Sequence, residues 1–258
     1  MPGVFDRKRR RAIVRKISED YEDALSTYFG TKRPDQVAAK YQHVGYVAAL
    51  ESCGVEVEIL EALEGHPDCC FVEDTAIIFE DTAVICNPGH PSRAGEVESI
   101  AKRLSKEFEI QKMPTDTMMD GGDVIFTGTE LLIGLSTRTN ANGAAFLSKF
   151  AAERNIPAQI IDVPKTTLHL TTVCSVPRNG TIIAAEGHLR PDQLEMFEEV
   201  IWVPEDEAYA ANTIAFEDGR IIISEGFPIT IERVRNAGFE PVIVPMSEIM
   251  QADGSLTC

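Results

Sequence analysis

The chain has 258 residues, of which 44% are hydrophobic and 25% charged, which is typical of a globular protein and sufficient for one large domain or two small ones. Its formal net charge is −17, and such an acidic surface repels phosphate backbones and anionic lipids. We therefore expect no nucleic-acid partner and no membrane partner, and no run approaches the ~20 apolar residues that span a bilayer.

The first predicted helix follows Pro34-Asp35, and Gly54 ends it. The alternation of apolar and acidic residues over 55–59 then predicts a strand. The segment 28–34, which contains Gly30, is the best candidate for a mobile surface loop. The predicted helix carries an apolar stripe at helical spacing, formed by Val37, Tyr41, Val44 and Ala48.

Four hairpins are predicted after this strand, each from two short apolar runs joined by turn residues such as Asn-Gly or Asp-Gly. The paired runs are 76–79 with 83–86, 124–126 with 131–133, 173–176 with 182–185, and 214–216 with 221–223. Helical patterns follow at 97–104 and 144–151, and further short strands at 159–163 and 241–244. The repeated unit is therefore strand, strand, helix, strand.

Polar residues recur at intervals of 43 to 49 residues, each at or just before an apolar run: Asp74, Asp120, His169, Asn212 and Cys258. Such a period indicates one supersecondary unit repeated around an axis, with these positions facing a common hub. An ordinary α/β or α+β sheet with similar hairpins is the alternative, but the even spacing favours the ring.

A fifth unit would be split between the two ends of the chain. Residues 256–258 would supply its first strand, and residues 12–14 with the following helix and strand would complete it. Joining the ends closes the ring and leaves no exposed sheet edge. No long linker divides the chain, so we expect a single domain over 1–258.

Cys258 and His169 are the candidate catalytic pair. A thiolate can attack an electrophilic carbon while a nearby imidazole carries the proton to the leaving group. Taken singly, a cysteine is more often a small buried hydrophobe and a histidine more often structural, but their matching phase in the repeat favours catalysis.

Acids gather in two segments. Asp68, Glu73 and Asp74 fall within seven residues, and Asp120 and Asp123 flank a Gly-Gly pair. Neighbouring acids repel one another unless a cation joins them, and a planar guanidinium matches carboxylate oxygens two by two. A turn with solvated acids is the alternative.

Arg93 and Arg138 follow successive hairpins at similar distances, so we expect them to clamp a carboxylate group together. Two exposed charges are the alternative. Acids at one end and arginines at the other would form a pocket for an amino acid with a guanidine side chain.

The six cysteines lack both the spacing of a zinc site and a preceding signal peptide. We therefore expect reduced thiols, a cytoplasmic location and no metal site. The basic run near the N-terminus, residues 7–11, is expected to be solvated.

Six segments together resemble the guanidino-group-modifying superfamily of pentein fold, most closely the dimethylarginine dimethylaminohydrolases. The resemblance runs from about Arg11 to Cys258 and is carried by PDCCFVED, NPGHPSR, MDGGDVIFTG, LSTRTN, LHL and DGSLTC. It implies a five-bladed α/β propeller with pseudo-fivefold symmetry, without cofactor, which hydrolyses Nω-methylated arginines to citrulline and dimethylamine or methylamine.

The resemblance also implies the roles of individual residues. Cys258 would be the nucleophile that forms an S-alkylthiouronium, and His169 the general acid and base. Asp74, and by position Asp120, would hold the guanidinium. Asp120 is one methylene shorter than the glutamate of many relatives, so its contact with a guanidine nitrogen is expected to be indirect.

The remaining roles concern the other end of the substrate. Asp68, with Glu73, would bind the α-amino group, and Arg93 and Arg138 the α-carboxylate. The loop at 28–34 resembles the lid of the family. A small-molecule substrate is the only partner expected, in a monomer or homodimer.

Three alternatives stay open. Arginine deiminase activity on unmodified arginine is disfavoured because Thr171 stands where such enzymes place an aspartate, two residues after the histidine. A non-catalytic pentein is disfavoured by the full set of candidate residues. An amidine-transferring enzyme would need glycine or ornithine as acceptor.

Overall fold

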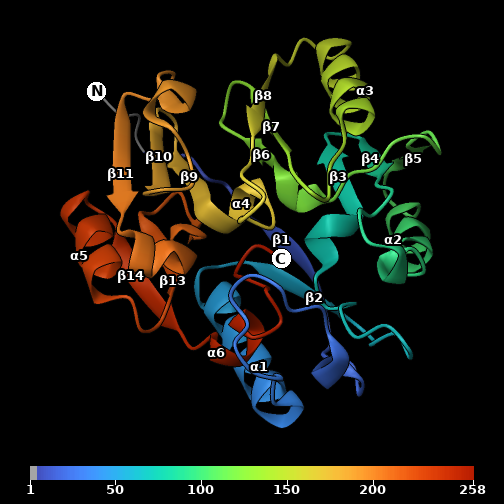
Figure 1. Cartoon of the computed structure of the whole chain (residues 1–258), viewed down its shortest axis with the longest axis horizontal. Helices are drawn as coiled ribbons and strands as arrows, with labels where there is room; N and C mark the ends of the chain where they lie inside the picture. The colour runs from blue at the N-terminus through green and yellow to red at the C-terminus, as the bar shows by residue number, and fades with distance from the viewer. Residues whose placement is uncertain (1–4) are drawn as a thin grey trace.

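The computed structural model describes residues 5–258 as a mixed α/β chain built from five small sheets. Figure 1 shows these sheets placed around the middle of the molecule, where the C-terminus lies. The strands are β1 (Arg11–Arg15), β2 (Glu56–Leu60), β3 (Ala76–Phe79), β4 (Thr82–Ile85), β5 (Glu109–Lys112), β6 (Val124–Phe126), β7 (Leu131–Leu135), β8 (Ala158–Asp162), β9 (Cys174–Arg178), β10 (Thr181–Ala185), β11 (Glu199–Val203), β12 (Ile214–Ala215), β13 (Arg220–Ser224) and β14 (Glu240–Val244).

Four sheets have three strands each and share one pattern. The first two strands form an antiparallel hairpin, and the third pairs in parallel with the second. A parallel partner requires a crossover connection, and in three of the four sheets a helix provides it. These helices are α2 (Val97–Leu104), α3 (Ala141–Ala152) and α5 (Pro228–Asn236). The four predicted hairpins and the repeated unit are confirmed, except that a short 3₁₀ turn (Pro191–Leu194) replaces the helix in the sheet of β9, β10 and β11.

The middle strand of each three-stranded sheet is the most deeply buried. In β13, the side chains of Ile221, Ile222 and Ile223 are all fully buried. Consecutive buried side chains point to opposite faces of a strand, so both faces of this sheet are covered. This explains why the middle strands read as continuous apolar runs rather than as alternating ones.

The fifth sheet differs from the prediction. It contains only β1 and β2, paired in parallel, with α1 (Gln36–Ser52) between them in the chain. Residues 256–258 form no strand. Their polar groups bond elsewhere: the Thr257 N–H donates to Asn212 Oδ1 (3.1 Å), and the Cys258 carbonyl accepts from the Glu73 N–H (3.1 Å).

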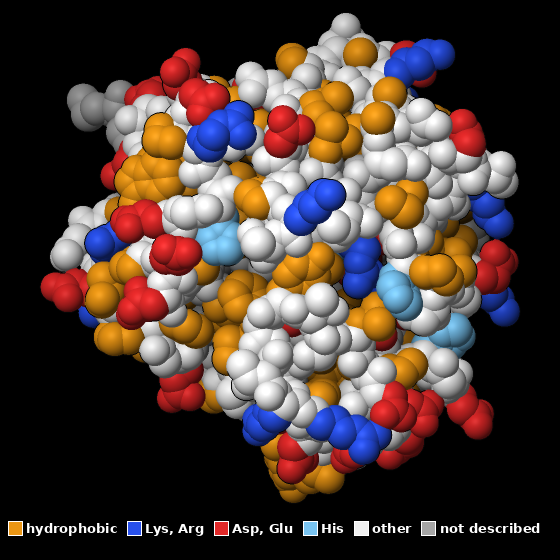
Figure 2. All heavy atoms as spheres, viewed as in Figure 1, with side chains coloured by type: hydrophobic (Ala, Val, Ile, Leu, Met, Phe, Trp, Pro, Cys, Tyr) orange, Lys and Arg blue, Asp and Glu red, His pale blue; other side chains and the backbone are white. Residues whose placement is uncertain are grey.

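The apolar stripe predicted for α1 is on the wrong face of the helix. Val37, Tyr41 and Val44 are 60%, 77% and 67% exposed. Hydrophobic atoms accordingly lie at the lower edge of Figure 2, where Figure 1 draws α1. The helix instead buries Val47 and Leu50, with neighbouring alanines, and packs on α6 (Ser247–Met250) and β14. Apolar residues occur on both faces, so spacing alone could not choose between them.

The N-terminal basic run, residues 7–11, is not simply solvated as expected. Arg7 donates to the carbonyls of Val176 (3.0 Å) and Thr127 (2.8 Å), and Arg9 donates to the carbonyl of Ala215 (3.1 Å). The run therefore ties three sheets together. Within the described residues, no helix is long and apolar enough to cross a membrane.

Candidate active site

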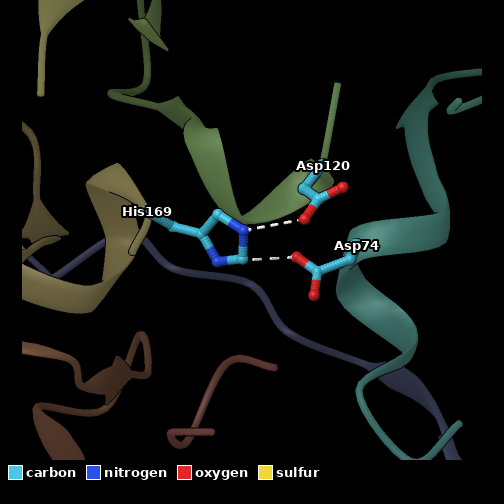
Figure 3. Close-up of side chains that lie close together, drawn as sticks. All are labelled: Asp74, Asp120 and His169. Carbon is cyan, nitrogen blue, oxygen red and sulfur yellow. Dashed lines mark hydrogen bonds and ion pairs between the residues drawn. The ribbon is translucent and has the colours of Figure 1, made fainter. Parts of the chain in front are cut away.

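In three of the sheets, the hub residue lies in or next to a short turn that precedes the first strand. Asp74 lies in the 3₁₀ turn before β3, Asp120 precedes the turn before β6, and His169 caps α4 (Leu170–Val173) before β9. Figure 3 shows the side chains of these three residues pointing toward one another from three separate segments. The predicted convergence of the hub positions is thus observed for these three.

The His169 imidazole is fixed at one nitrogen and free at the other. Its Nε2 lies 2.9 Å from Asp120 Oδ2, whereas its Nδ1 is buried without a hydrogen-bond partner, 3.8 Å from Asp74 Oδ1 (Figure 3). Burial lowers the pKa of His169, but the charges of Asp74, Asp120 and Asp123 outweigh it and raise the pKa to about 9. The ring is therefore an imidazolium at neutral pH, with one N–H available for a reaction.

Asp74 is held as a carboxylate in a buried network. It accepts from the Gly122 N–H (3.0 Å) and from the Arg93 guanidinium. Burial alone would raise its pKa, but His169 and Arg93 lower it below the ordinary value. Arg93 is itself buried and also donates to Glu96 (2.7 Å) and to the Phe71 carbonyl (2.8 Å). The N–H groups of Arg93 thus bond to other groups of the protein, although Arg93 also lines the cavity described below.

Asp120 is fully buried and joins His169 to Arg138. Its Oδ1 accepts from the Gly89 N–H (2.6 Å), and its Oδ2 lies 3.5 Å from Arg138 Nη1. The guanidinium of Arg138 makes no other hydrogen bond to the residues that the structure describes, so it retains free donors. Asp120 is thus a partner of the imidazole, and its expected indirect contact with a guanidine stays a prediction.

Cys258 shares a small cavity with these groups. The cavity, of about 20 Å³, is lined by Asp68, Asp74, Arg93, Arg138, His169 and Cys258, together with Leu25, Phe71, Leu168 and 252–254. The Sγ lies 3.3 Å from Ser255 Oγ. Burial, followed by the charges of Glu73 and Asp74, raises the pKa of the thiol, so the resting group is a neutral thiol beside an imidazolium.

Comparison with known proteins identifies the family. The family model of N,N dimethylarginine dimethylhydrolase, eukaryotic, matches residues 19–258. The chain belongs to the dimethylarginine dimethylaminohydrolase family. It is 30% identical over 252 residues to the N(G),N(G)-dimethylarginine dimethylaminohydrolase of Pseudomonas aeruginosa, with 96% of this chain and 97% of that protein covered. The protein of that name from Streptomyces coelicolor is 29% identical over 252 residues, with 96% and 95% covered.

Solved structures agree with this assignment. A Cys-to-Ser variant of the Pseudomonas aeruginosa protein, complexed with citrulline, superposes with a TM-score of 0.91 at 29% identity and covers 97% of each chain. The N-terminal domain of ArgZ, a cyanobacterial arginine dihydrolase, superposes with a TM-score of 0.87 at 19% identity, with 96% of this chain and 95% of that one covered, which supports the fold alone. This dimethylarginine dimethylaminohydrolase family member is therefore a hydrolase of pentein fold.

The structure brings most of the predicted site residues of this family member together, with one exception. Glu73 does not line the small cavity beside Asp68. It accepts from Thr257 Oγ1 (2.8 Å), and burial, followed by the charge of Asp74, raises its pKa to about 7. Glu73 thus lies next to the thiol segment rather than at the predicted amino end. Its expected role there stays a prediction that the geometry does not favour.

Sequence reasoning gave no role to Asp123, which positions the histidine. It is fully buried, and its Oδ1 accepts from the Leu170 N–H (2.9 Å). Its Oδ2 accepts from the hydroxyls of Ser136 and Thr139 (both 2.6 Å), and Ser136 Oγ accepts from the Arg138 N–H (2.9 Å). Asp123 therefore connects the backbone next to the imidazole with the loop of Arg138. In the sequence, the Gly-Gly pair next to Asp123 was the feature that could have pointed to this role.

Asn212 and Asp253 were also left without roles. Asn212 Nδ2 donates to Thr171 O (2.8 Å) and Thr257 Oγ1 (2.9 Å), which fixes the segment before Cys258. The Asp253 carboxylate accepts the backbone N–H groups of residues 27–30, and Gln251 accepts those of residues 31 and 32. The predicted loop is thus fixed by hydrogen bonds to Gln251 and Asp253, and Asp253 lines the cavity.

Asp74, Asp120 and His169 could also hold a metal, because one ligand atom of each lies within 4.8 Å of the others. However, these oxygens already have partners. Asp74 accepts from Gly122 and Arg93, and Asp120 accepts from Gly89 and His169. The guanidinium of Arg93 already pairs with Asp74, so these three residues fit a metal ion poorly.

Proposed function

We propose that this protein hydrolyses Nω-methylated arginine to citrulline and dimethylamine or methylamine, through a covalent S-alkylthiouronium on Cys258. The observation that carries the proposal is the imidazole of His169, which Asp120 holds at Nε2, whose Nδ1 has no hydrogen-bond partner, and which lines one cavity with Cys258 and Asp74. An amino acid with a guanidinium matches acids at one end and a free arginine at the other.

The reaction begins when the substrate binds with its guanidinium group in the site. A guanidinium beside Asp74 and Cys258 adds positive charge next to the thiol and lowers its pKa, so the thiol proton passes to solvent. The thiolate then attacks the guanidinium carbon, which becomes tetrahedral. The imidazolium of His169 donates its proton to the methylated nitrogen, the carbon–nitrogen bond breaks, and the amine leaves.

Hydrolysis of the intermediate uses the same residues. Neutral His169 removes a proton from water, and the resulting hydroxide attacks the thiouronium carbon. The carbon–sulfur bond of the second tetrahedral adduct breaks, the hydroxyl proton of that adduct passes to the departing sulfur, and citrulline leaves. The protons gained and lost by His169 balance, so the enzyme returns to its starting state.

The other contacts of the substrate follow from the cavity lining. Arg138 retains free donors and binds the α-carboxylate, with Arg93 as a second, more fully engaged partner. Asp68 binds the α-amino group, although its Oδ1 accepts from the Leu25 N–H (3.1 Å) in the closed loop. The cavity of about 20 Å³ cannot hold an amino acid of this size, so the loop over 25–35 must move for the substrate to enter.

The proposal includes the architecture. The four three-stranded sheets and the sheet of β1 and β2 are taken as five blades of a propeller with pseudo-fivefold symmetry, whose axis passes near the hub residues. A monomeric or homodimeric state and a cytoplasmic location remain predictions. Size-exclusion chromatography with light scattering tests the former.

A substrate panel tests the reaction. Arginine, monomethylarginine and both dimethylarginine isomers are incubated with the enzyme, and citrulline is measured by a colour reaction. We expect citrulline from monomethylarginine and asymmetric dimethylarginine and much less from arginine. Citrulline mainly from arginine would favour a deiminase. No citrulline from folded protein would defeat the enzyme proposal, and a new guanidino compound formed with glycine would indicate amidine transfer.

A further inference from the structure

Asn212 is the hub residue that the proposed reaction does not use. It recurs at the same phase of the repeat as the other hub residues, and it lies between the 3₁₀ helix Glu205–Ala211 and β12. Its side chain is fully buried, but it does not line the small cavity that His169 and Cys258 share. Because a buried amide group needs hydrogen-bond partners, the question is which segments these partners belong to.

The amide of Asn212 joins two segments that carry the reacting groups. Its Nδ2 donates to the Thr171 carbonyl (2.8 Å) and to Thr257 Oγ1 (2.9 Å), and its Oδ1 accepts from the Thr257 N–H (3.1 Å). Thr171 lies in α4, two residues after His169, and Thr257 directly precedes Cys258. Both N–H groups and the oxygen of the amide thus have partners, which fixes the orientation of the amide.

The bond to Thr171 acts on the imidazole side. The helix α4 has a single turn, and the carbonyl groups at the end of a helix have no partner within it. Asn212 supplies a donor to one of these carbonyls. His169 is joined to the same turn, because its backbone N–H donates to Thr172 Oγ1 (3.2 Å). A shift of this turn would therefore move the imidazole.

The two bonds to Thr257 act on the thiol side. They hold the backbone N–H and the side-chain oxygen of the residue before Cys258, so this residue is fixed at two points. The Thr257 hydroxyl also donates to Glu73 Oε2 (2.8 Å), and the Glu73 N–H donates to the Cys258 carbonyl (3.1 Å). Residues 257 and 258 are therefore bonded to both Asn212 and Glu73.

We propose that Asn212 is a positioning residue, which sets the distance between the imidazole of His169 and the sulfur of Cys258 through its bonds to α4 and Thr257. Figure 1 draws both α4 and the C-terminus near the middle of the molecule. Attack by the sulfur and proton transfer from the imidazole must reach one substrate carbon and its leaving nitrogen, so a small misplacement slows turnover. This consequence rests on the proposed function, whereas the connection of the two segments does not.

Asn212→Ala removes all three bonds of the amide. We expect kcat for dimethylarginine to fall about 10²-fold and KM to change less than about threefold, because the residues proposed to bind the substrate are unchanged. Amide hydrogen exchange at residue 257 should become faster, since its N–H loses its acceptor, while β13 should exchange as in the parent. Ser175→Ala is the matched control, because Ser175 is buried and donates to the Ala211 carbonyl (2.6 Å). It should lower Tm and leave kcat unchanged.

Thr257→Val is a milder variant that keeps the shape of the side chain and the backbone N–H. It removes the hydroxyl that accepts from Asn212 and donates to Glu73, and this donation lowers the pKa of Glu73. We expect kcat to fall about tenfold and the acidic limb of kcat/KM to move to higher pH, and Thr257→Ser to restore both. A purely structural role would not move the limb. The other titratable or charged neighbours of Glu73 are unchanged by the substitution: Asp74, His169, Arg9, Tyr46 and Cys258.

The double variant tests whether the two residues form one connection. Asn212→Ala combined with Thr257→Val should lose no more kcat than Asn212→Ala alone, because both substitutions break the same link. Losses that multiply would overturn the proposal, as would an Asn212→Ala variant whose KM rises as much as its kcat falls. If Asn212→Ala does not fold, Thr257→Val decides, and an unchanged kcat with an unmoved limb would overturn the proposal.

Failure of the proposed function gives a different result. In that case the folded parent protein forms no citrulline from any methylated arginine, and amide exchange at residue 257 decides the role of Asn212. Faster exchange there in Asn212→Ala, with β13 unchanged, would still show that Asn212 holds the segment before Cys258. Exchange equal to that of the parent at residue 257 would overturn this connection.

Discussion

The imidazole side and the thiol side of the site are built differently. On the imidazole side, His169, Asp74, Asp120 and Asp123 lie in one buried network in which almost every oxygen has a donor. On the thiol side, Cys258 makes a single side-chain hydrogen bond to the described residues, with Ser255, and borders a groove of about 490 Å³. The residues of the first region precede three of the three-stranded sheets, whereas residues of β1 and β2 line the groove beside the second region.

The two sides are suited to two different tasks, proton transfer on the imidazole side and nucleophilic attack on the thiol side of the proposed reaction. A fixed network of charges holds the imidazolium in one orientation and sets its pKa, which preorganises proton transfer. In the proposed reaction, the thiol approaches and leaves a carbon atom, and its ionisation depends on a substrate that is itself a cation. The proposal therefore assigns orientation of the substrate to the carboxylates of the imidazole side, and it assigns the nucleophile to the segment whose neighbours hold the loop.

The largest effect is expected at the thiol. Cys258→Ser should lower turnover by about 10⁴-fold or more, because a serine hydroxyl beside an imidazolium has no base to activate it. Binding of dimethylarginine, measured by calorimetry, should change little, because the carboxylates of the imidazole side and Arg138 are unchanged. Cys70→Ser, at another partly buried cysteine, is the control and should retain activity. Retained turnover in Cys258→Ser would exclude the sulfur as nucleophile.

On the imidazole side, Asp120→Asn should lower kcat by about 10²-fold, with little change in KM, because an amide cannot stabilise the imidazolium. The variant also removes one of the charges that raise the pKa of His169, so the alkaline limb of the pH profile should move to lower pH. Asp192→Asn, at an exposed acid paired with Arg190, is the control. An unshifted alkaline limb would argue that Asp120 does not act through His169.

Arg138→Ala should raise KM for dimethylarginine by about 30-fold, which corresponds to the loss of a charge-assisted hydrogen bond to the α-carboxylate. A substrate that lacks the carboxylate should be affected far less. Arg190→Ala, at an exposed arginine, serves as the control. Equal losses for both substrates would reject the clamp and assign Arg138 to the support of Asp120 alone.

The convergence of the site could be predicted because it depends on the phase of a repeat. Equal spacing placed Asp74, Asp120 and His169 at equivalent points of successive sheets, and the structure joins them directly. The stripe of α1 could not be predicted, since apolar residues occur on two faces and only tertiary packing selects one. Arg93 was expected to be free for a carboxylate, but the acids Asp74 and Glu96 engage it, and these contacts depend on tertiary approach.

Contacts between distant segments were the least accessible to sequence reasoning. Asp253 meets the backbone of residues 27–30 across more than 220 positions of the chain, and backbone donors leave no mark in a sequence. The strand expected at 256–258 was inferred from the same repeat phase that located Cys258, but these residues bond to Asn212 and Glu73 instead. The phase of the repeat therefore predicted correctly where Cys258 lies, but the strand that it predicted at 256–258 is wrong.

The pH profile tests how the two sides cooperate. We expect kcat/KM to rise through about pH 7 as Glu73 loses its proton, and to fall as the pH rises through about 9 and His169 loses its proton. Glu73→Gln should remove the acidic limb and lower activity about tenfold, since the anion favours the guanidinium. An acidic limb that persists in this variant would assign it to another group.

The raised pKa of His169 also makes the stability of the fold depend on pH. Its pKa is higher in the folded chain than the ordinary value of about 6.5, so the folded state binds more protons between that pH and about 9. The contribution of His169 to the free energy of unfolding is complete below about pH 6.5 and is lost as the pH rises through about 9. Thermal unfolding across this range, in the parent and in His169→Asn, isolates the contribution.

The smallest expected effect concerns the closed loop. Asp253 lines the small cavity, adopts a left-handed backbone (φ 56°) and accepts four backbone N–H groups from residues 27–30. Asp253→Asn keeps one side-chain acceptor but loses the charge, so the closed loop becomes less stable. We expect KM to rise about threefold to tenfold with a smaller change in kcat, because charge-assisted hydrogen bonds are lost in the closed state only.

Amide hydrogen exchange separates this effect from a general loss of stability. Residues 27–30 should exchange faster in Asp253→Asn, while β13 in the core should exchange as in the parent protein. Glu248→Gln is the graded comparison, because Glu248 accepts one loop N–H, from Asp35, and pairs with Lys32. Unchanged exchange at 27–30 would mean that the loop is held by its other contacts, and the thiol side would then contribute the nucleophile without controlling access to it.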